Sequence, residues 1–329
     1  MMQYLKDLGE YYVVEQILNL IKSSRASYLP PGDDAVALKL GNYFVVVNVD
    51  TLIARYCMLP GMTLYDLGWR VVTASASDLA SKLAQPKIFL ISISMPGTTP
   101  LEDVLDFTRG AIDASRYYGA ELCGGDTNES SDIVVSAVGI GLTDIEPLPR
   151  SGLRPGDVVA VTGAFGYTGL VFKAYYSGVE LDRLPRKFIE KTYRPRARVD
   201  IVPVLREIRS YLTASSDSSD GLVRTLYNLA EASGVSIVLD RLPISDEVSE
   251  VCAQFGFSPE EVVLYGGEEF ELVLGIRPSS IDEVIRRFHS IGTELLVVGR
   301  ATEGRGVVYL KSGSEVRKLP LSGWEYFRK

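Results

Sequence analysis

The chain has 329 residues, of which 46% are hydrophobic and 23% are charged, the composition of an ordinary globular protein. Its net charge is −8 and its basic clusters, at 183–187 and 194–198, are short and mixed, which argues against a nucleic-acid-binding protein. The apolar runs are far shorter than the ~20 residues of a membrane helix, and the N-terminal residues lack the pattern of a secretory signal. We therefore expect a cytoplasmic protein with no membrane or nucleic-acid partner.

The cysteine and histidine content narrows the chemistry further. Three cysteines without a CxxC pair argue against a disulfide framework and against a zinc–cysteine site. The single histidine, His289, lies in an amphipathic segment typical of a helix end, with no nucleophile motif beside it. Any bound metal should therefore have oxygen ligands, which suits Mg²⁺ rather than zinc.

Hydrophobic periodicity predicts alternating helices and strands in the first half. The predicted helices are 4–22, 66–83 and 101–119, and the predicted strands are 43–49, 88–94 and 133–142, with a loop at 27–38. The three strands are too apolar to leave one sheet face in water, so we expect a homodimer formed through this half. A stretch rich in Pro, Gly and Arg, 146–157, predicts a boundary between domains 1–147 and 148–329.

The second half has a similar mixture. The predicted strands are 158–162, 236–239, 270–276, 295–298 and 307–311, and the predicted helices are 170–177, 203–211, 221–233 and 279–290. Hairpin-like and helix-separated strands both occur, so each half is expected to be α/β or α+β. A glycine-rich turn at 163–169 joins a strand to a helix, and a phosphate-binding loop and a plain turn are equally good interpretations of it.

Five short acidic motifs occur at or near the ends of apolar runs. They are Gly32-Asp33-Asp34, Val49-Asp50-Thr51, Ser77-Asp78-Leu79, Gly124-Gly125-Asp126-Thr127 and Asp217-Ser218-Ser219-Asp220-Gly221. Each alone is typical of a turn, and Asp220 could cap the helix that follows it. Together they predict carboxylates that converge on one pocket, where they would repel each other unless cations such as Mg²⁺, bound with nucleotide phosphates, fill the space. No GxxxxGK[ST] loop and no protein-kinase signature occurs.

In order and spacing, the motifs resemble those of the thiamine-monophosphate kinase family, within the aminoimidazole ribonucleotide synthetase superfamily. The resemblance covers nearly the whole chain, through GDDAVAL, VDTLI, SDLASKLAQP, GGDT, RSGLRPGDVVAVTGAFG, SSDGL, GGEEFEL and GWEYF. It implies an N-terminal domain whose strands form a barrel across a homodimer, and a C-terminal α/β domain. It also implies that ATP and several Mg²⁺ ions bind between the two domains.

The resemblance also implies the site residues. The metal site would comprise Asp34, Asn48, Asp50, Thr51, Asp78, Asp126, Asp217 and Asp220, with Asn48 contributing main chain and the choice between Asp33 and Asp34 left open. ATP would contact Gly125, Asp126, Arg150 and Ser219, and the acceptor would contact Glu268, Trp324 and the position of Cys57. No residue is expected to act as acid, base or nucleophile, because transfer of the γ-phosphoryl group of ATP to the phosphate of thiamine monophosphate needs positioning and charge neutralisation.

Several positions depart from the family pattern. Arg55-Tyr56-Cys57 stands where the family often has a histidine, Ser75 replaces an asparagine, Lys82-Leu83-Ala84 replaces Met-Gly-Ala, and Asn128-Glu129-Ser130 follows GGDT in place of an arginine. The nucleotide site is thus better supported than the acceptor. Two alternatives stay open: another ATP-using member, such as an amide- or carbonyl-activating synthetase or a maturation factor, and a non-catalytic nucleotide-binding homologue. A selenophosphate enzyme is disfavoured because no cysteine precedes Cys57.

Overall fold

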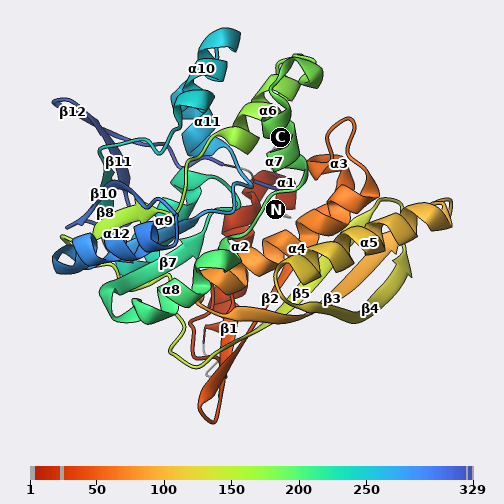
Figure 1. Cartoon of the computed structure of the whole chain (residues 1–329), viewed down its shortest axis with the longest axis horizontal. Coiled ribbons are helices and arrows are strands. Elements are labelled where there is room, and N and C mark those ends of the chain that lie inside the picture. The colour runs from red at the N-terminus through yellow and green to blue at the C-terminus, as the bar shows by residue number, and fades with distance from the viewer. Residues whose placement is uncertain (1–3, 23–25, 324, 328–329) are drawn as a thin grey trace.

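The computed structural model describes residues 4–22, 26–323 and 325–327, and the chain folds around two sheets, one in each half (Figure 1). Among the described helices, none combines the length and apolarity needed to cross a membrane. The elements of the first half are α1 (Leu5–Leu8), α2 (Glu10–Ile21), β1 (Val36–Leu40), β2 (Tyr43–Ile53), α3 (Ala54–Cys57), α4 (Leu64–Ser81), β3 (Gln85–Met95), α5 (Leu101–Tyr117), β4 (Glu121–Glu129) and β5 (Val134–Thr143).

The first sheet has the strand order β1-β2-β5-β3-β4, and only the β3–β4 pair is parallel. Residues of β5 alternate strictly between buried and partly exposed, because one face of the sheet packs under α4 and α5 (Figure 1). The two helices cross at Gly68 and Gly110. A Cβ on Gly68 would lie 2.1 Å from the Phe107 carbonyl oxygen, so no larger residue allows this close approach.

The opposite face of this sheet carries apolar side chains that are open to solvent in the single chain. The exposed apolar residues on β1, β2 and β3 are Val36, Leu38, Leu40, Tyr43, Val49 and Ile88. An apolar face of this extent is typical of a surface that a partner covers. The homodimer therefore stays a prediction, and this apolar face is the surface through which we expect it to form.

The second half is built on a seven-stranded sheet with the order β12-β11-β8-β10-β6-β9-β7. Its elements are β6 (Val158–Val161), α6 (Tyr167–Tyr176), η1 (Leu181–Arg183), α7 (Arg186–Tyr193), η2 (Arg198–Ile201), α8 (Val202–Glu207), η3 (Arg209–Tyr211), β7 (Leu212–Asp217), α9 (Leu222–Ser233), β8 (Ser236–Leu239), α10 (Asp246–Phe255), α11 (Pro259–Tyr265), β9 (Leu272–Ile276), η4 (Pro278–Ser280), α12 (Ile281–Ser290), β10 (Leu296–Thr302), β11 (Val308–Ser312) and β12 (Glu315–Lys318).

Helices cover both faces of this sheet. On β6, Val159 and Val161 belong to the core shared with α9, whereas Val158 and Ala160 belong to the core shared with α8 and α12. This explains why β6 is apolar at every position and has no polar alternation. The expected two-part α+β architecture is confirmed, and α6, α7, α10 and α11 pack together in a further apolar cluster.

Several predicted elements were wrong in detail. The single helix expected over 4–22 is broken at Gly9, whose φ of +80° is outside the helical range. The strand expected over 43–49 continues as β2 to Ile53, so Asp50 lies inside a strand. The loop expected over 27–38 contains the start of β1, and α3, β4, β7, β12, α7, α10 and α11 were not predicted. The exposed helix end expected at His289 is confirmed, in the last turn of α12.

Helix α4 connects the two halves. Trp69 Nε1 donates to the Pro195 carbonyl at 2.8 Å, and Lys82, at the C-cap, donates to the Ser215 carbonyl at 2.9 Å. Because these partners belong to the second half, α4 fixes how the two sheets sit relative to each other. The boundary at 147/148 stays a prediction.

Candidate functional site

Three of the predicted aspartates converge between the two sheets. Asp34 precedes β1, Asp78 lies near the C-terminal end of α4, and Asp217 ends β7; one carboxylate oxygen from each lies within 4.8 Å of the others. Asp50 joins them, because one Asn48 side chain bonds to both Asp50 and Asp78. We call Asp34, Asp50, Asp78 and Asp217 the acidic cluster. The convergence expected from the five motifs is therefore present in the structure for four of them.

Asn48 fixes two members of the cluster. Its Nδ2 donates to Asp50 Oδ2 and to Asp78 Oδ2, each at 2.9 Å, and its Oδ1 accepts from Ser75 Oγ at 2.9 Å. Since these contacts occupy both ends of its amide, the Asn48 side chain orients carboxylates, and a metal contact through its main chain stays a prediction.

Three members of the cluster, Asp50, Asp78 and Asp217, have raised pKa values. Burial, reinforced by neighbouring carboxylates, raises the pKa of Asp217 to about 7 and that of Asp78 well above its ordinary value. Burial raises the pKa of Asp50 to about 6. Groups in this state gain most when a cation neutralises them, so these three are the residues best suited to hold a divalent ion.

Asp33 and Asp34 are in the opposite situation. Lys82 Nζ lies 2.6 Å from Asp33 Oδ1 and 2.7 Å from Asp34 Oδ2, and Arg150 forms an ion pair with Asp34. Burial alone would raise the pKa of Asp34, but Arg150 and Lys82 lower it to about 2. The structure thus places two cationic side chains, Lys82 and Arg150, at this end of the cluster.

Arg150, a predicted ATP contact, is largely engaged within the protein. Besides Asp34, its guanidinium donates to the Gly32 carbonyl at 2.7 Å and to Ser216 Oγ at 3.2 Å. Its side chain nevertheless remains 23% exposed. A contact with ATP through this exposed part stays a prediction.

The loop after β7 meets the GGEEF segment. Glu268 N–H donates to the Ser219 carbonyl at 2.6 Å, and Glu268 itself has a φ of +61°, which is uncommon for a residue with a side chain. Burial raises the pKa of Asp220 to about 6. Asp220 does not cap α9, because the N-cap is Gly221 and no side chain bonds there. The ion-binding interpretation of Asp220 is thereby favoured over the capping one.

On the predicted acceptor side, the structure adds Arg70, which the motifs did not indicate. Its guanidinium forms an ion pair with Glu268 and donates to the Thr192 carbonyl, and its side chain is 1% exposed. Cys57 is buried next to this pair, and burial raises the pKa of its thiol to about 12, so the thiol stays protonated. Trp324 lies outside the described residues.

Asp126 and Gly125 are not brought to the acidic cluster of the same chain. Through the strand register, Asp50 pairs with Ala137, Ala137 with Ile91, and Ile91 with Gly125, so three strand spacings, roughly 14 Å, separate Asp50 from this part of β4. Asp126 is exposed and accepts from Asn128 Nδ2 at 2.7 Å. This distance is too long for Asp50 and Asp126 of one chain to hold the same ion.

Two further positions have local structural explanations. A Cβ on Gly125 would lie 1.6 Å from the Ile91 carbonyl oxygen, so glycine is required there by the close approach of β3 and β4. Thr51 is exposed, and its Oγ1 lies 2.8 Å from Ser136 Oγ on β5. Their contacts with ATP and metal stay predictions.

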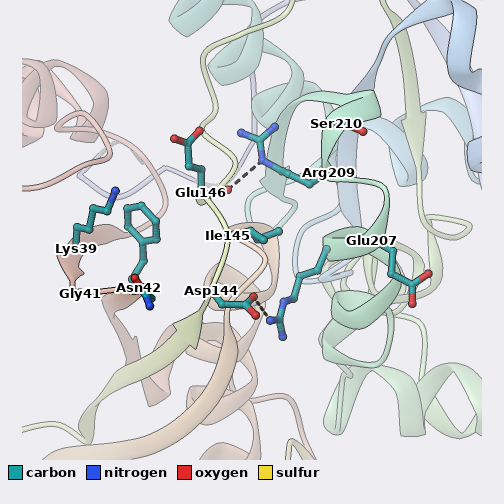
Figure 2. A pocket seen from close by; sticks show the side chains of 11 residues that line it. Lys39, Gly41, Asn42, Asp144, Ile145, Glu146, Glu207, Arg209 and Ser210 are labelled. Carbon is teal, nitrogen blue, oxygen red and sulfur yellow. Dashed lines mark hydrogen bonds and ion pairs between the residues drawn. The ribbon is translucent and has the colours of Figure 1, made fainter.

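A pocket of about 830 Å³ lies away from these residues (Figure 2). The β1–β2 hairpin, with Lys39 and Asn42, lies on one side, and Arg209 and Glu207 lie on the other, with the interdomain linker between them. Arg209 donates to the Glu146 carbonyl at 3.0 Å, Arg206 pairs with Asp144 within the lining, and Glu207 pairs with Arg287 outside it. None of the predicted site residues that the structure describes lines this pocket, so it is not the candidate active site.

Comparison with known proteins places the chain in a family. The models for the AIR synthase related protein N-terminal and C-terminal domains match residues 32–143 and 154–311. The thiamine-monophosphate kinase of Pyrococcus abyssi is 34% identical over 90% of both chains, and that of Aquifex aeolicus is 29% identical over 98% of this chain and 99% of its own.

Solved structures agree with this assignment. The protein tt0281 from Thermus thermophilus matches with a TM-score of 0.86 and 34% identity, over 96% of this chain and 100% of its own. The complex of AaThiL with AMPPCP and TMP matches with a TM-score of 0.86 and 28% identity, over 99% of both chains. The hydrogenase maturation protein HypE, at 17% identity and a TM-score of 0.70, shares the fold. The chain therefore belongs to the thiamine-monophosphate kinase family of AIR synthase related proteins.

Proposed function

We propose that the protein transfers the γ-phosphoryl group of ATP to the phosphate of thiamine monophosphate, giving ADP and thiamine diphosphate. One observation carries it: largely buried carboxylates from three separate segments converge at the junction of the two sheets, and on one side they form no ion pair with the described residues. The relative AaThiL, which was solved with AMPPCP and TMP, supports the choice of both substrates.

The residues present fit Mg²⁺. The donors are carboxylate oxygens, which Mg²⁺ prefers, and burial raises the pKa of Asp50, Asp78 and Asp217, as expected for groups that a cation would relieve. We assign the ion to these three side chains. When bound, Mg²⁺ would neutralise the negative charge of the phosphates that meet there.

The chain's own residues position the reactants. An oxygen of the acceptor phosphate attacks the γ-phosphorus, the bond to the β,γ-bridging oxygen breaks, and its electron pair leaves with ADP. The acceptor is already an anion, so no base is required, in agreement with the remote, exposed His289. Arg150, partly exposed beside Asp34, offers positive charge on the nucleotide side.

The acceptor side is assigned to Glu268 and Arg70. The left-handed backbone of Glu268 turns its carboxylate toward Arg70 of α4, and the buried guanidinium holds it there. Glu268 is thereby oriented where a cationic thiazolium ring would be recognised. Arg70 acts through Glu268 and is a positioning residue.

We also propose a homodimer formed through the exposed apolar face of the first sheet. Asp126 lies on the exposed edge strand β4, too far from Asp50 to serve the same ion within one chain. A second copy packed on this face can bring its own GGDT segment to the acidic cluster. The proposed dimer therefore accounts both for the apolar face and for the GGDT motif.

The acceptor assignment is tested by incubating the protein with ATP, Mg²⁺ and, at equal concentration, thiamine monophosphate, thiamine or other phosphate esters. ADP release and the diphosphate product are measured, with Asp50→Asn as the inactive control. We expect turnover with thiamine monophosphate and none with thiamine. Preference for another ester would overturn the acceptor, and nucleotide binding without turnover on any acceptor would indicate a non-catalytic homologue.

A further inference from the structure

Lys82 is a fully buried ammonium group with a complete set of partners. Its side chain exposes no surface, and its Nζ lies 2.6 Å from Asp33 Oδ1, 2.7 Å from Asp34 Oδ2 and 2.9 Å from the Ser215 carbonyl. An ammonium group has three donors, and these three oxygens satisfy all of them. Leu83, which follows, has a φ of +59°, so the backbone makes a tight turn where α4 ends.

The same contacts leave Asp34 without a free oxygen. Its Oδ1 accepts from Arg150 and, at 2.9 Å, from Ser216 Oγ, whereas its Oδ2 accepts from Lys82 and, at 2.8 Å, from Ser81 Oγ. By contrast, Asp50 and Asp78 share the hydrogens of the single Asn48 amide. The cluster thus has one end that the protein itself neutralises and one end that it does not.

We propose that Lys82 is a built-in cation that occupies the Asp33–Asp34 end of the acidic cluster and confines divalent ions to the Asp50–Asp78–Asp217 end. A divalent ion drawn to Asp34 Oδ2 would lie within a few ångströms of the buried ammonium, and the two positive charges would repel each other strongly in this poorly solvated region. Asp34 is then an anchor for Lys82 and Arg150 and not a metal ligand. This inference rests on the proposed divalent-ion site, but not on the identity of the acceptor.

The assignment depends on a lysine at this position, since Lys82-Leu83-Ala84 departs from the Met-Gly-Ala of the family pattern. It also gives the lysine a second task. Since Ser215 belongs to β7 and Lys82 to α4, the ammonium joins the two halves in the absence of metal. The site should therefore be assembled before a divalent ion binds.

The test compares the wild-type protein with Lys82→Met, a replacement of similar length without charge. Bound Mn²⁺ is counted by electron paramagnetic resonance, and the Mg²⁺-induced shift of the thermal midpoint is measured from a chelator-treated start. We expect Lys82→Met to bind about one additional Mn²⁺ per chain and to show the larger Mg²⁺ shift, because its uncovered carboxylates need a cation. Lys173→Met, which breaks a surface ion pair with Glu261, serves as control and should match the wild type.

If Lys82→Met does not fold without metal, Asp33→Asn is added to it, which removes one of the uncovered charges. The double variant should fold and still bind Mn²⁺ at the Asp34 end. Equal Mn²⁺ counts and equal Mg²⁺ shifts in wild type and variants would overturn the inference, as would wild-type protein that binds no Mn²⁺. Failure of thiamine monophosphate as acceptor would leave this result unaffected.

Discussion

Replacing Asp217 by asparagine should stabilise the metal-free protein above neutral pH and remove most of its response to Mg²⁺. Asp217 is 5% exposed at the end of β7, and neighbouring carboxylates add their repulsion to the effect of burial. Its burial without compensation costs folding free energy whenever it is ionised. Asparagine keeps the shape of the side chain but carries no charge, so it removes both this cost and the attraction for a divalent ion.

The sign and size of the effect follow from the pKa. The pKa of Asp217 rises from 3.8 to about 7 on folding. Below about pH 4 the group is protonated in both states and imposes no cost. Between about pH 4 and 7 the folded state retains a proton that the unfolded state has released, so stability falls as pH rises. Above about pH 7 the full cost applies, on the order of 4 kcal/mol for a shift of about three pKa units.

Denaturant unfolding in the presence of a chelator, at about pH 5, 6.5 and 8, measures this directly. The wild type should lose stability across the series, and Asp217→Asn should lose less and exceed the wild type at the highest pH. Adding Mg²⁺ at that pH should stabilise the wild type far more than the variant. Asp182→Asn, at an exposed carboxylate, is the matched control. A wild type equally stable at both ends of the series, or a variant less stable at the highest pH without metal, would refute the reasoning.

Two further predictions concern the surroundings of the cluster. Gly139→Ala should weaken Mn²⁺ binding and cost about 1–3 kcal/mol of stability, because its Cβ would lie 2.3 Å from Ser75 Oγ and 2.6 Å from Asn48 Oδ1. Mn²⁺ titration and denaturant unfolding measure the two effects. Gly141→Ala, whose Cβ would lie 3.1 Å or more from its neighbours, is the control. Mixing two inactive variants, Asp126→Asn and Asp217→Asn, should restore activity if each site draws on two chains, since one site of a mixed dimer is then intact. Light scattering follows the assembly, and a mixture that exchanges subunits but stays inactive would contradict the shared site.

Four of the five acidic motifs could be assigned to one cluster because each motif is local and can be recognised in the sequence. Asp34, Asp78 and Asp217 come from three segments far apart in the chain, yet each carries its own flanking signature. At any single motif, a helix cap or a turn explained the aspartate as well as ion binding did. What favoured ion binding was the number of carboxylates, since a protein rarely buries several without a cation.

The strands around the motifs were harder to predict. β4 contains Gly124 and Gly125 and is exposed along most of its length, so it lacks the apolar alternation that identifies a strand. Its extended form depends on pairing with β3, which is distant in the sequence and is not indicated by the composition of β4. For the same reason, the distance between Asp126 and Asp50 followed only from the register of the sheet.

Helix α4 carries a pattern of charged residues that is present in the sequence but is easily missed beside the helix's apolar stripe. Arg70, Asp78 and Lys82 are spaced by eight and four residues, so they lie within about 120° of one another around the helix. Charged residues at such spacing in an otherwise buried helix indicate a polar stripe that faces a partner inside the protein. Their partners, Glu268 for Arg70 and Asp33 with Asp34 for Lys82, come from distant segments and could not be assigned beforehand.

This stripe also relates the two ends of the proposed reaction. Eight residues of helix separate Arg70 from Asp78, roughly 12 Å at about 1.5 Å per residue. Arg70 holds Glu268 by an ion pair on the proposed acceptor side, and Asp78 belongs to the cluster proposed to hold the divalent ion. One helix, tied to the second half through Lys82, would therefore fix the distance between the proposed acceptor and phosphate-donor sites. Since phosphoryl transfer between two anions depends on placing them in line, α4 supplies the geometry while the acidic cluster supplies the place for charge neutralisation.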